Sequence, residues 1–420
     1  MKRILMVLAV LVCCSGWAAA DEGAVDQAVV DAAKCVRVNG FISQGYLRSD
    51  KNNFLATTKA KGSAEFNEVG LTITANVTPK LRIGTQFLSR DLGAVGNNEV
   101  RLDWAFGDYH FNDYFGVRIG KVKMPIGLYN QGRDSDFVRP MVFLPQSIYD
   151  ENKRDLLVAY EGGGIYGNIP LAAAGDLEYQ GFAGELNFQD DSALAKSFKS
   201  TSQKLVTQKG LGTFSSLTID NNYVLGGAAI YNTPLSGLRL GTSYMQGQTD
   251  LTIGASGITT TKPNGELRMK HKLVYSLEYS NKYFLLAGEY SESNRHQTIL
   301  GTDVMKGPSQ EYYGMAAINL VEGLSLNLLY DVMYESMGDR EGLKYKQQGQ
   351  YDFMGWRKDH GVGFRYDVNP HWTLKAEYHY VDGCANLMAV VNPPPTTAPN
   401  SKPDLSRYWD YVAVKASFNF

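Results

Sequence analysis

Residues 372–380 read Trp-Thr-Leu-Lys-Ala-Glu-Tyr-His-Tyr, a stretch in which apolar and polar side chains alternate without exception. Successive side chains of a β-strand point to opposite faces of the sheet, so a period of two predicts a strand with one apolar and one polar face. The same alternation, with few exceptions, recurs in residues 69–77, 272–279 and 323–335. The sequence therefore predicts a protein built from amphipathic strands.

The pattern of connections separates a membrane barrel from a soluble sandwich, whose strands also alternate. Compact turns are expected at residues 78–80, 112–113, 233–237, 280–282, 322–323 and 369–370. Long polar stretches are expected at residues 49–66, 189–220, 248–268, 294–310, 337–357 and 384–406. Short turns on the periplasmic side and long loops outside are typical of outer-membrane barrels, as are aromatic residues at the ends of the apolar faces.

Counting the alternating segments predicts an all-β fold, a transmembrane antiparallel β-barrel of about sixteen strands. The predicted spans are 36–48, 67–78, 81–90, 99–111, 114–123, 156–167, 176–188, 222–232, 237–250, 269–280, 282–293, 310–321, 323–336, 358–368, 371–382 and 408–420. An even number of strands puts both ends of the barrel chain on the periplasmic side.

The N-terminus is typical of a secretory signal peptide. Lys2 and Arg3 precede the short apolar run 4–12, and small residues at 18–20 close the segment, so residues 1–20 are expected to be removed. The apolar run is shorter than the roughly 20 residues that a spanning helix needs. Residues 21–35 are expected to form a periplasmic N-terminal segment, either a short helix or a tail, that could contact a periplasmic partner. Residues 36–420 are the predicted barrel.

Composition excludes several other classes of protein. The net charge of −2 is no footprint of nucleic-acid binding. Only Cys35 and Cys384 remain after the signal peptide, which argues against a disulfide scaffold, and the predicted topology puts them at opposite ends of the barrel. No Cys-x-x-Cys-His motif is present for haem attachment, and no acidic or histidine spacing indicates a metal site. We therefore expect no cofactor.

The last ten residues, Tyr-Val-Ala-Val-Lys-Ala-Ser-Phe-Asn-Phe at 411–420, form an amphipathic strand whose apolar face ends on the final residue. This stretch resembles the closing-strand signal by which the barrel-assembly machinery recognises outer-membrane proteins. The resemblance implies that Phe418 and Phe420 serve as the assembly signal.

Residues 124–155 differ from the other long connections because they are rich in proline and aromatic residues. An apolar loop in water is unfavourable, so this third outer loop is predicted to fold into the lumen. The stretches 120–130 and 139–149 resemble Gram-negative diffusion porins. The resemblance implies a sixteen-stranded barrel in outer-membrane lipid and lipopolysaccharide, usually a homotrimer, in which this loop narrows the channel.

Charged residues on the predicted loop and on the polar faces of nearby strands are candidates for the pore. The pore and constriction candidates are Arg82, Arg90, Arg101, Arg118, Arg133, Asp134, Asp136, Arg139, Asp150 and Glu151, with Lys153 and Arg154 completing the loop. We expect wall arginines to oppose acidic loop residues across a wet lumen, and we expect a weak preference for anions.

The predicted function is passive diffusion of ions and small hydrophilic solutes across the outer membrane of a Gram-negative bacterium. One alternative is a porin-like sheath around a cytochrome that carries electrons across the membrane. A second is a barrel enzyme, for which the evidence is thin: the six histidines are scattered, and His379 beside Glu377 has no accompanying nucleophile motif. We therefore expect no catalytic residues.

Overall fold

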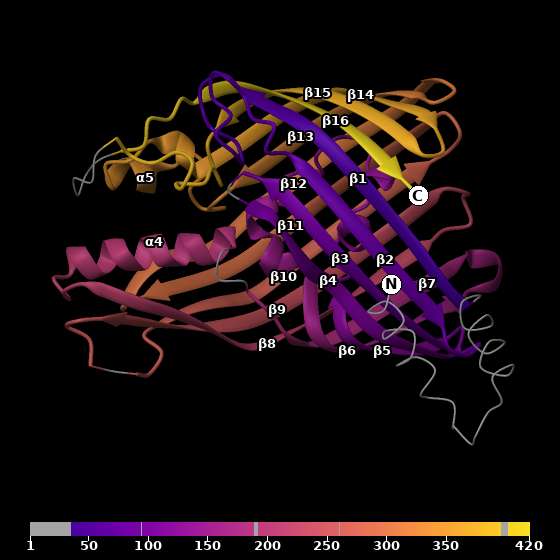
Figure 1. Ribbon diagram of the computed structural model, residues 1–420, viewed down its shortest axis with the longest axis horizontal. Coiled ribbons are helices and arrows are strands. Elements are labelled where there is room, and N and C mark those ends of the chain that lie inside the picture. The colour runs from indigo at the N-terminus through magenta and orange to yellow at the C-terminus, as the bar shows by residue number, and fades with distance from the viewer. Residues whose placement is uncertain (1–34, 94, 189–191, 260, 396–401) are drawn as a thin grey trace, which may run out of the picture.

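The computed structural model describes residues 35–93, 95–188, 192–259, 261–395 and 402–420. Its main element is a closed antiparallel barrel of sixteen strands (Figure 1). The strands are β1 Val36–Ser49, β2 Asn67–Asn76, β3 Leu81–Leu92, β4 Val95–Asn112, β5 Phe115–Lys123, β6 Ala159–Pro170, β7 Asp176–Glu185, β8 Phe214–Asn232, β9 Leu238–Ala255, β10 Gly265–Ser280, β11 Phe284–Ile299, β12 Thr302–Val321, β13 Leu324–Tyr334, β14 Trp356–Asn369, β15 Trp372–Gly383 and β16 Tyr408–Asn419. The predicted fold class is confirmed, whereas the predicted signal peptide and the N-terminal segment through residue 34 lie outside the described residues.

The barrel closes where the first strand pairs with the last. Phe41 of β1 lies opposite Asn419, and the antiparallel register continues to Ser49 opposite Tyr411. Beyond it, Phe420 and Gly40 exchange two backbone hydrogen bonds of 3.0 Å. The proposed assembly residues, Phe418 and Phe420, therefore lie at the periplasmic end of the closing seam.

Strand β15 shows why the alternating pattern forms a membrane barrel and not a sandwich. Its apolar side chains face outward, with Trp372 and Tyr380 each 43% exposed, while Lys375 and His379 face inward and are buried. A soluble sandwich buries its apolar faces, so an apolar exterior with a polar interior requires lipid around the barrel. Among the described residues, no helix has both the length and the apolar character to cross a membrane.

The two ends of the barrel differ in the way the sequence predicted. Short turns and the C-terminus gather at one end, and the long connections gather at the other, which is the outer end (Figure 1). Helix α4, Ala193–Gln208, lies at the outer end between β7 and β8. The short helix α5, Leu343–Gln347, and the 3₁₀ turn η5, Asp352–Gly355, lie between β13 and β14.

The prediction of long loops at residues 248–268 and 294–310 is wrong for most of each range. Strand β9 continues to Ala255 and β10 begins at Gly265, and a two-residue turn at 300–301 separates β11 from β12. In these strand ends the outward side chains are polar, as at Gln248, Asp250 and His296, whereas inward ones such as Leu251 and Ile253 are apolar and buried. The pattern of apolar outward and polar inward side chains therefore reverses within the strand, so the membrane-strand pattern ends before the strand does.

The outward face offers a direct test of the fold. Val414 points to lipid near the middle of β16 and is 39% exposed. We expect Val414→Arg to lower the free energy of unfolding by about 2–4 kcal/mol, because that is the cost of a basic side chain at the bilayer midplane. Urea unfolding in lipid vesicles measures this cost. The control is Val390→Arg in the outer loop, which should have little effect, and an equal loss in both variants would contradict the assignment of the lipid face.

Candidate functional site

Residues 124–155, here called the plug segment, lie inside the barrel and contact one side of its wall through β9, β10 and β11. The Gly127 N–H donates to Ser243 Oγ at 3.0 Å, the Tyr129 hydroxyl to Glu278 Oε2 at 2.8 Å and the Leu128 N–H to Glu289 Oε1 at 2.9 Å. Because β9 to β11 are consecutive strands, these three contacts fix the start of the segment against one sector of the barrel.

The later part of the plug segment contacts a further sector of the wall, β13 to β15. The Ser147 N–H donates to Asp331 Oδ2 of β13 at 3.0 Å, and the Val142 N–H donates to Glu377 Oε2 of β15 at 2.8 Å. Arg365 of β14 donates to the carbonyl oxygen of Phe137 at 2.7 Å. The segment therefore contacts the inner wall at β9 to β11 and at β13 to β15, which confirms that the third outer loop folds inward.

A first group of ion pairs, the lateral network, attaches the plug segment to β4 and β5. Arg154 lies 2.8 Å from Asp103 Oδ1 and 2.6 Å from Asp134 Oδ1. Lys123 lies 2.7 Å from Asp103 Oδ2 and also contacts Asp134. Each carboxylate of this network thus contacts two cations. The wall contributes Asp103 and Lys123 and the plug segment contributes Asp134 and Arg154, so each side carries one acidic and one basic group.

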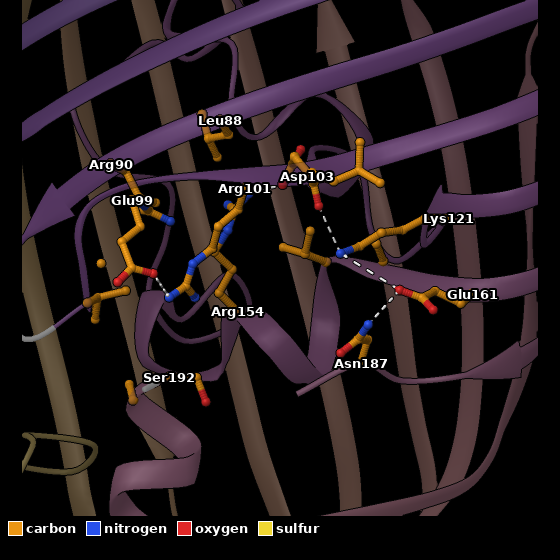
Figure 2. Close-up of a pocket in the computed structure, with 16 residues that line it drawn as sticks. Leu88, Arg90, Glu99, Arg101, Asp103, Lys121, Arg154, Glu161, Asn187 and Ser192 are labelled. Atoms are coloured by element: carbon orange, nitrogen blue, oxygen red, sulfur yellow. Dashed lines mark hydrogen bonds and ion pairs between the residues drawn. The ribbon is translucent and has the colours of Figure 1, made fainter. Parts of the chain in front are cut away.

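Arg101, one of the pore candidates, lies beside Arg154 of the plug segment at a side cavity. It lines a cavity of about 380 Å³ at the outer end of β3 to β6, where its guanidinium is 2.9 Å from Glu99 (Figure 2). Lys121 borders the same cavity and donates to the carbonyl oxygen of Leu102 at 2.9 Å. The cavity lies where β4 and β5 separate, because their pairing ends at Ala105 opposite Lys121.

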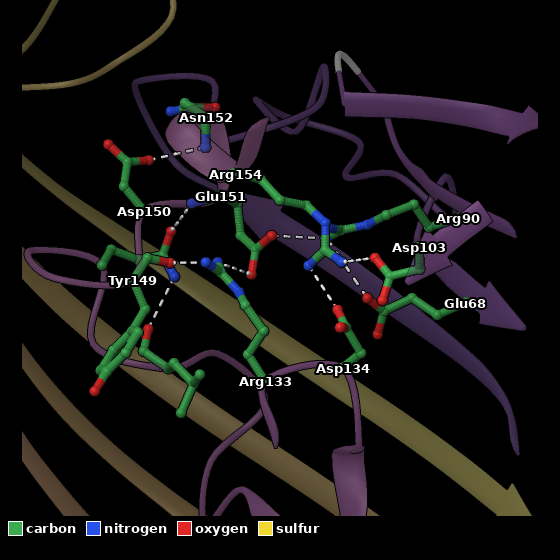
Figure 3. A network of polar contacts seen from close by, with 12 residues as sticks. Glu68, Arg90, Asp103, Arg133, Asp134, Tyr149, Asp150, Glu151, Asn152 and Arg154 are labelled. Atoms are coloured by element: carbon green, nitrogen blue, oxygen red, sulfur yellow. Dashed lines mark hydrogen bonds and ion pairs between the residues drawn. The ribbon is translucent and has the colours of Figure 1, made fainter. Parts of the chain in front are cut away.

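A second group, the central network, surrounds Glu151 (Figure 3). Arg90 of β3 donates to Glu151 Oε2 at 2.9 Å, and Arg133 donates to Glu151 Oε1 at 3.1 Å. Arg133 also donates to the carbonyl oxygen of Tyr149 at 2.8 Å. Arg90 lies 3.5 Å from Glu68 of β2, so a chain of alternating charges links the plug segment to two strands.

Asp136 extends the central network to β15 and β16. Its Oδ1 accepts from Arg139 at 2.6 Å and lies 3.2 Å from Lys375 and 3.3 Å from Lys415. Its Oδ2 accepts from the Ser417 hydroxyl at 2.5 Å. One carboxylate on the plug segment therefore meets three cations, two of which belong to strands β15 and β16.

The central network is buried. The side chains of Arg133, Asp136, Lys375 and Lys415 are all at most 1% exposed. The expectation that these charges border a water-filled lumen is therefore wrong at mid-height. The reason is that the plug segment packs directly on the wall, so protein groups take the place of water around these charges. A buried ion is tolerated only when it has such a partner of opposite charge.

Comparison with solved structures identifies the fold. The chain matches OmpF of Salmonella typhi in complex with daunomycin, with a TM-score of 0.56 and 12% identity over 92% of this chain and 97% of that chain. It matches the anion-selective porin from Comamonas acidovorans with a TM-score of 0.53 and 11% identity over 92% and 99% of the two chains. It also matches OmpT of Vibrio cholerae in its trimer form, with a TM-score of 0.51 and 10% identity over 92% and 99%.

The chain has the fold of Gram-negative outer-membrane porins. No protein-family model matches the sequence, and no curated protein matches it either. The likeness to porins is therefore one of three-dimensional structure. The porin fold here carries an inward segment between β5 and β6, as the resemblance in the sequence implied.

Two other candidate arginines of the porin barrel form a separate cluster in its periplasmic half. Arg82 lies 2.7 Å and Arg118 lies 3.3 Å from Asp108 Oδ2. The Tyr166 hydroxyl donates to Asp108 Oδ1 at 2.5 Å, and its ring lies 4.1 Å from the Arg118 guanidinium. Arg82 keeps 46% of its side chain exposed, so this cluster borders water. The last candidate, Asp150, has a local role, because it accepts from the Asn152 N–H at 2.9 Å to cap the 3₁₀ turn η3, Glu151–Lys153.

Apolar packing seals the outer half of the lumen between the plug segment and β5 to β11. Met124, Ile148 and Leu157 of the segment and its continuing helix α3, Arg154–Leu157, pack in one buried cluster with wall residues such as Val224 and Met245. Such a cluster in the interior of a porin barrel excludes water. The plug segment is thus held by ion pairs on β2 to β5, β15 and β16, by hydrogen bonds on β9 to β11 and β13 to β15, and by the apolar cluster.

Sequence reasoning missed several residues of the site. Glu68 was readable, since it precedes the apolar positions of β2 on the polar face, where it now contacts three cations. Glu289 carried no signal, because its role depends on donors far away in the chain: the hydroxyls of Tyr149 and Tyr313 donate to it at 2.5 and 2.8 Å. Lys123, at the end of β5, was seen only as part of the porin-like stretch.

The acidic groups of the plug segment are held in their charged form. Burial alone raises the pKa of Glu151, but the attraction of Arg90, Arg133 and other arginines outweighs it and holds the pKa well below its ordinary value. For Asp136, burial is likewise outweighed by Lys375 and other cations, so its pKa also lies well below its ordinary value. Both carboxylates therefore stabilise the inserted segment as anions.

These directions predict how the closed state depends on pH. A depressed pKa contributes stability that is fully present above the ordinary pKa and is lost only as the pH falls through the lowered value. We therefore expect the conductance of the wild type to stay constant from pH 7 to about pH 4, near the ordinary carboxyl pKa, and to rise only in stronger acid. Planar-bilayer recordings over a pH series measure this. Opening between pH 6 and pH 5 would show that other groups control the segment.

Proposed function

We propose that this chain is an outer-membrane channel of a Gram-negative bacterium through which ions and small hydrophilic solutes diffuse passively, and that the plug segment gates it. One observation carries the proposal. The plug segment, residues 124–155, crosses the lumen of a closed sixteen-stranded barrel, and it contains no strand that pairs with the wall. A barrel of this size encloses an aqueous channel when nothing fills it. Movement of the segment is therefore the step that opens the path.

The two vestibules support this function. A cavity of about 610 Å³ opens at the outer end, and one of about 580 Å³ opens at the periplasmic end, bordered by Val138 and Pro140 of the plug segment. Asp150 and Lys153 of the same segment border the outer cavity. Because the plug segment borders both cavities, displacement of this segment is enough to let a solute pass from one cavity to the other.

The weak anion preference is part of the proposal. Among the described residues bordering the outer cavity, the charged ones are Asp150, Lys153, Lys196 and Arg295, so basic groups exceed acidic ones. Basic groups at the entrance raise the local concentration of anions. The likeness to a porin named as anion-selective agrees with this preference. The likeness to a trimeric OmpT agrees with a homotrimer.

The alternatives have less support. A cytochrome sheath needs a lumen wide enough for a protein, and here the plug segment spans it from Glu289 of β11 to Arg90 of β3. A barrel enzyme needs an accessible reactive group. His379 is instead 1% exposed, lies 2.7 Å from Asp359 and 3.3 Å from Glu377, and stacks on Tyr411, so its contacts suit a structural role.

Single-channel recording of the purified protein in a planar bilayer tests the proposal. We expect brief and infrequent openings, steps in groups of three if the channel is a trimer, and a reversal potential in a salt gradient whose sign reports a weak anion preference. Heat-modifiable protein that never conducts, at any voltage or at low pH, would refute the channel function.

A further inference from the structure

The outer vestibule has the form of a ligand site. Its volume of about 610 Å³ lies within the range of small-molecule pockets, roughly 300–1,000 Å³. Helix α4, the connection after β15 and the outer ends of β10 to β12 surround it. The apolar side chains on its sides include Leu156, Leu194, Phe198, Leu267, Met305 and Leu387. An amphipathic molecule can bury its apolar part among them.

Two basic residues stand on the plug side of this vestibule, where it meets the barrel wall. Lys153 Nζ donates to Asn386 Oδ1 at 2.9 Å and lies 3.4 Å from Asp150. Arg295 of β11 donates to Ser309 Oγ at 3.3 Å and lies 3.8 Å from Glu335. Lys153 and Arg295 also border a narrow crevice between the plug segment and β10 to β12. They therefore lie at the junction between the vestibule and this crevice.

The charges at this junction favour an anionic ligand. Lys153 is buried, and burial together with the neighbouring Arg295 lowers its pKa from the ordinary value. The single carboxylate that borders the vestibule among the described residues, Asp150, already accepts the Asn152 N–H. Glu311 and Glu335 also attract Lys153, but neither borders the vestibule. On the vestibule side an anion therefore meets more basic groups than acidic ones, and between Lys153 and Arg295 it forms charge-assisted hydrogen bonds with both.

We propose that the outer vestibule is a binding site for small amphipathic carboxylates, with the carboxylate on Lys153 and Arg295 and the apolar chain against α4 and the connection after β15. That such an anion is also the solute of the channel rests on the proposed function. Its binding to the vestibule does not depend on that function, because the vestibule lies on the outer side of the closed plug segment.

The test is a titration of the full-length protein in lipid nanodiscs with hexanoate, followed by calorimetry. Hexylammonium and hexanol, which share the chain but not the charge, are the matched probes. We expect hexanoate to bind at least about tenfold more tightly than hexylammonium, since each charge-assisted hydrogen bond is worth about that factor. We expect Lys153→Gln and Arg295→Gln each to weaken hexanoate about tenfold and to leave hexanol unchanged.

Two control variants accompany this test. Lys282→Gln removes the same charge from the periplasmic vestibule and should leave hexanoate binding unchanged. Val390→Asp adds an anion at the exposed outer edge, 56% exposed in the wild type, and should weaken hexanoate without disturbing the core. Equal binding of hexanoate and hexylammonium, or no effect of Lys153→Gln and Arg295→Gln, overturns the proposal.

The conductance of the same preparation separates this proposal from the channel function. Hexanoate binding without conductance sustains the site and refutes the channel. Conductance without hexanoate binding refutes the site alone. The binding site is also refuted if the hexanoate signal equals the partition of hexanoate into protein-free nanodiscs.

Discussion

Replacing residues 125–157 with Asn-Gly is expected to convert a nearly closed barrel into one that conducts continuously. The increase in mean conductance should be on the order of tenfold or more, because a sixteen-stranded barrel with nothing in its lumen holds an aqueous channel. The barrel should survive the change. The Met124 N–H donates to the Val158 carbonyl at 2.9 Å, and Lys123 lies opposite Ala159, so the two ends already form the last rung of a hairpin. Asn-Gly is the favoured two-residue turn for such a hairpin.

A matched deletion controls for the loss of an outer connection as such. Residues 337–353 join β13 to β14, and the Glu335 N–H donates to the Gly355 carbonyl at 2.9 Å, so the same Asn-Gly turn fits there. This connection does not cross the lumen, and its replacement should leave the conductance near that of the wild type. Planar-bilayer recording of both variants, with heat-modifiability as the check on folding, gives the comparison. A folded 125–157 variant that conducts no more than the wild type would mean that another part of the chain closes the barrel.

Asp136→Asn is expected to open the channel without removing any residue. In the inserted state, Asp136 lies between Arg139, Lys375 and Lys415 and accepts from Ser417. Neutralising it leaves Lys375 buried without its carboxylate partner, and breaking a buried pair costs about 3–5 kcal/mol. The cost falls on the inserted state alone, because release of the plug segment returns the cations to water. The open population should therefore rise roughly a hundredfold or more.

The open probability in single-channel recordings measures this effect. Adding Lys375→Met to Asp136→Asn removes the stranded cation and should restore much of the closure, which a general loss of stability would not allow. Asp404→Asn is the control at an exposed pair, since the Asp404 side chain is 85% exposed and lies 3.4 Å from Lys59. Surface pairs of this kind are worth at most about 1 kcal/mol. An unchanged open probability in folded Asp136→Asn would show that Asp136 does not hold the segment.

The two predictions separate the two kinds of contact that close the lumen. Asp136→Asn weakens only ion pairs, chiefly those with β15 and β16, whereas the deletion also removes the apolar contacts of Ile148 and Leu157. If the ion pairs dominate, the point variant should approach the conductance of the deletion. If apolar packing dominates, its openings should be more frequent but still brief.

The sequence by itself determined the barrel. Alternation in stretches such as 372–380 depends only on which side chains share a face, and sixteen such stretches with short and long connections give the strand number and orientation. The apolar composition of residues 124–155 was enough to predict that this loop leaves water and enters the lumen. These are local properties of the chain, so they can be read without knowing any contact.

Only the tertiary structure decided what the charges do. Asp136 meets Lys415 from a strand nearly 280 residues later, and Arg101 lines a side cavity where it pairs with Glu99. The polar face of a strand is the same whether water or a protein segment covers it, so alternation predicts that Lys375 faces the lumen but not that it is dry. Burial depends on what lies opposite, and the closure of this barrel is therefore a property of the folded plug segment that no single stretch of sequence contains.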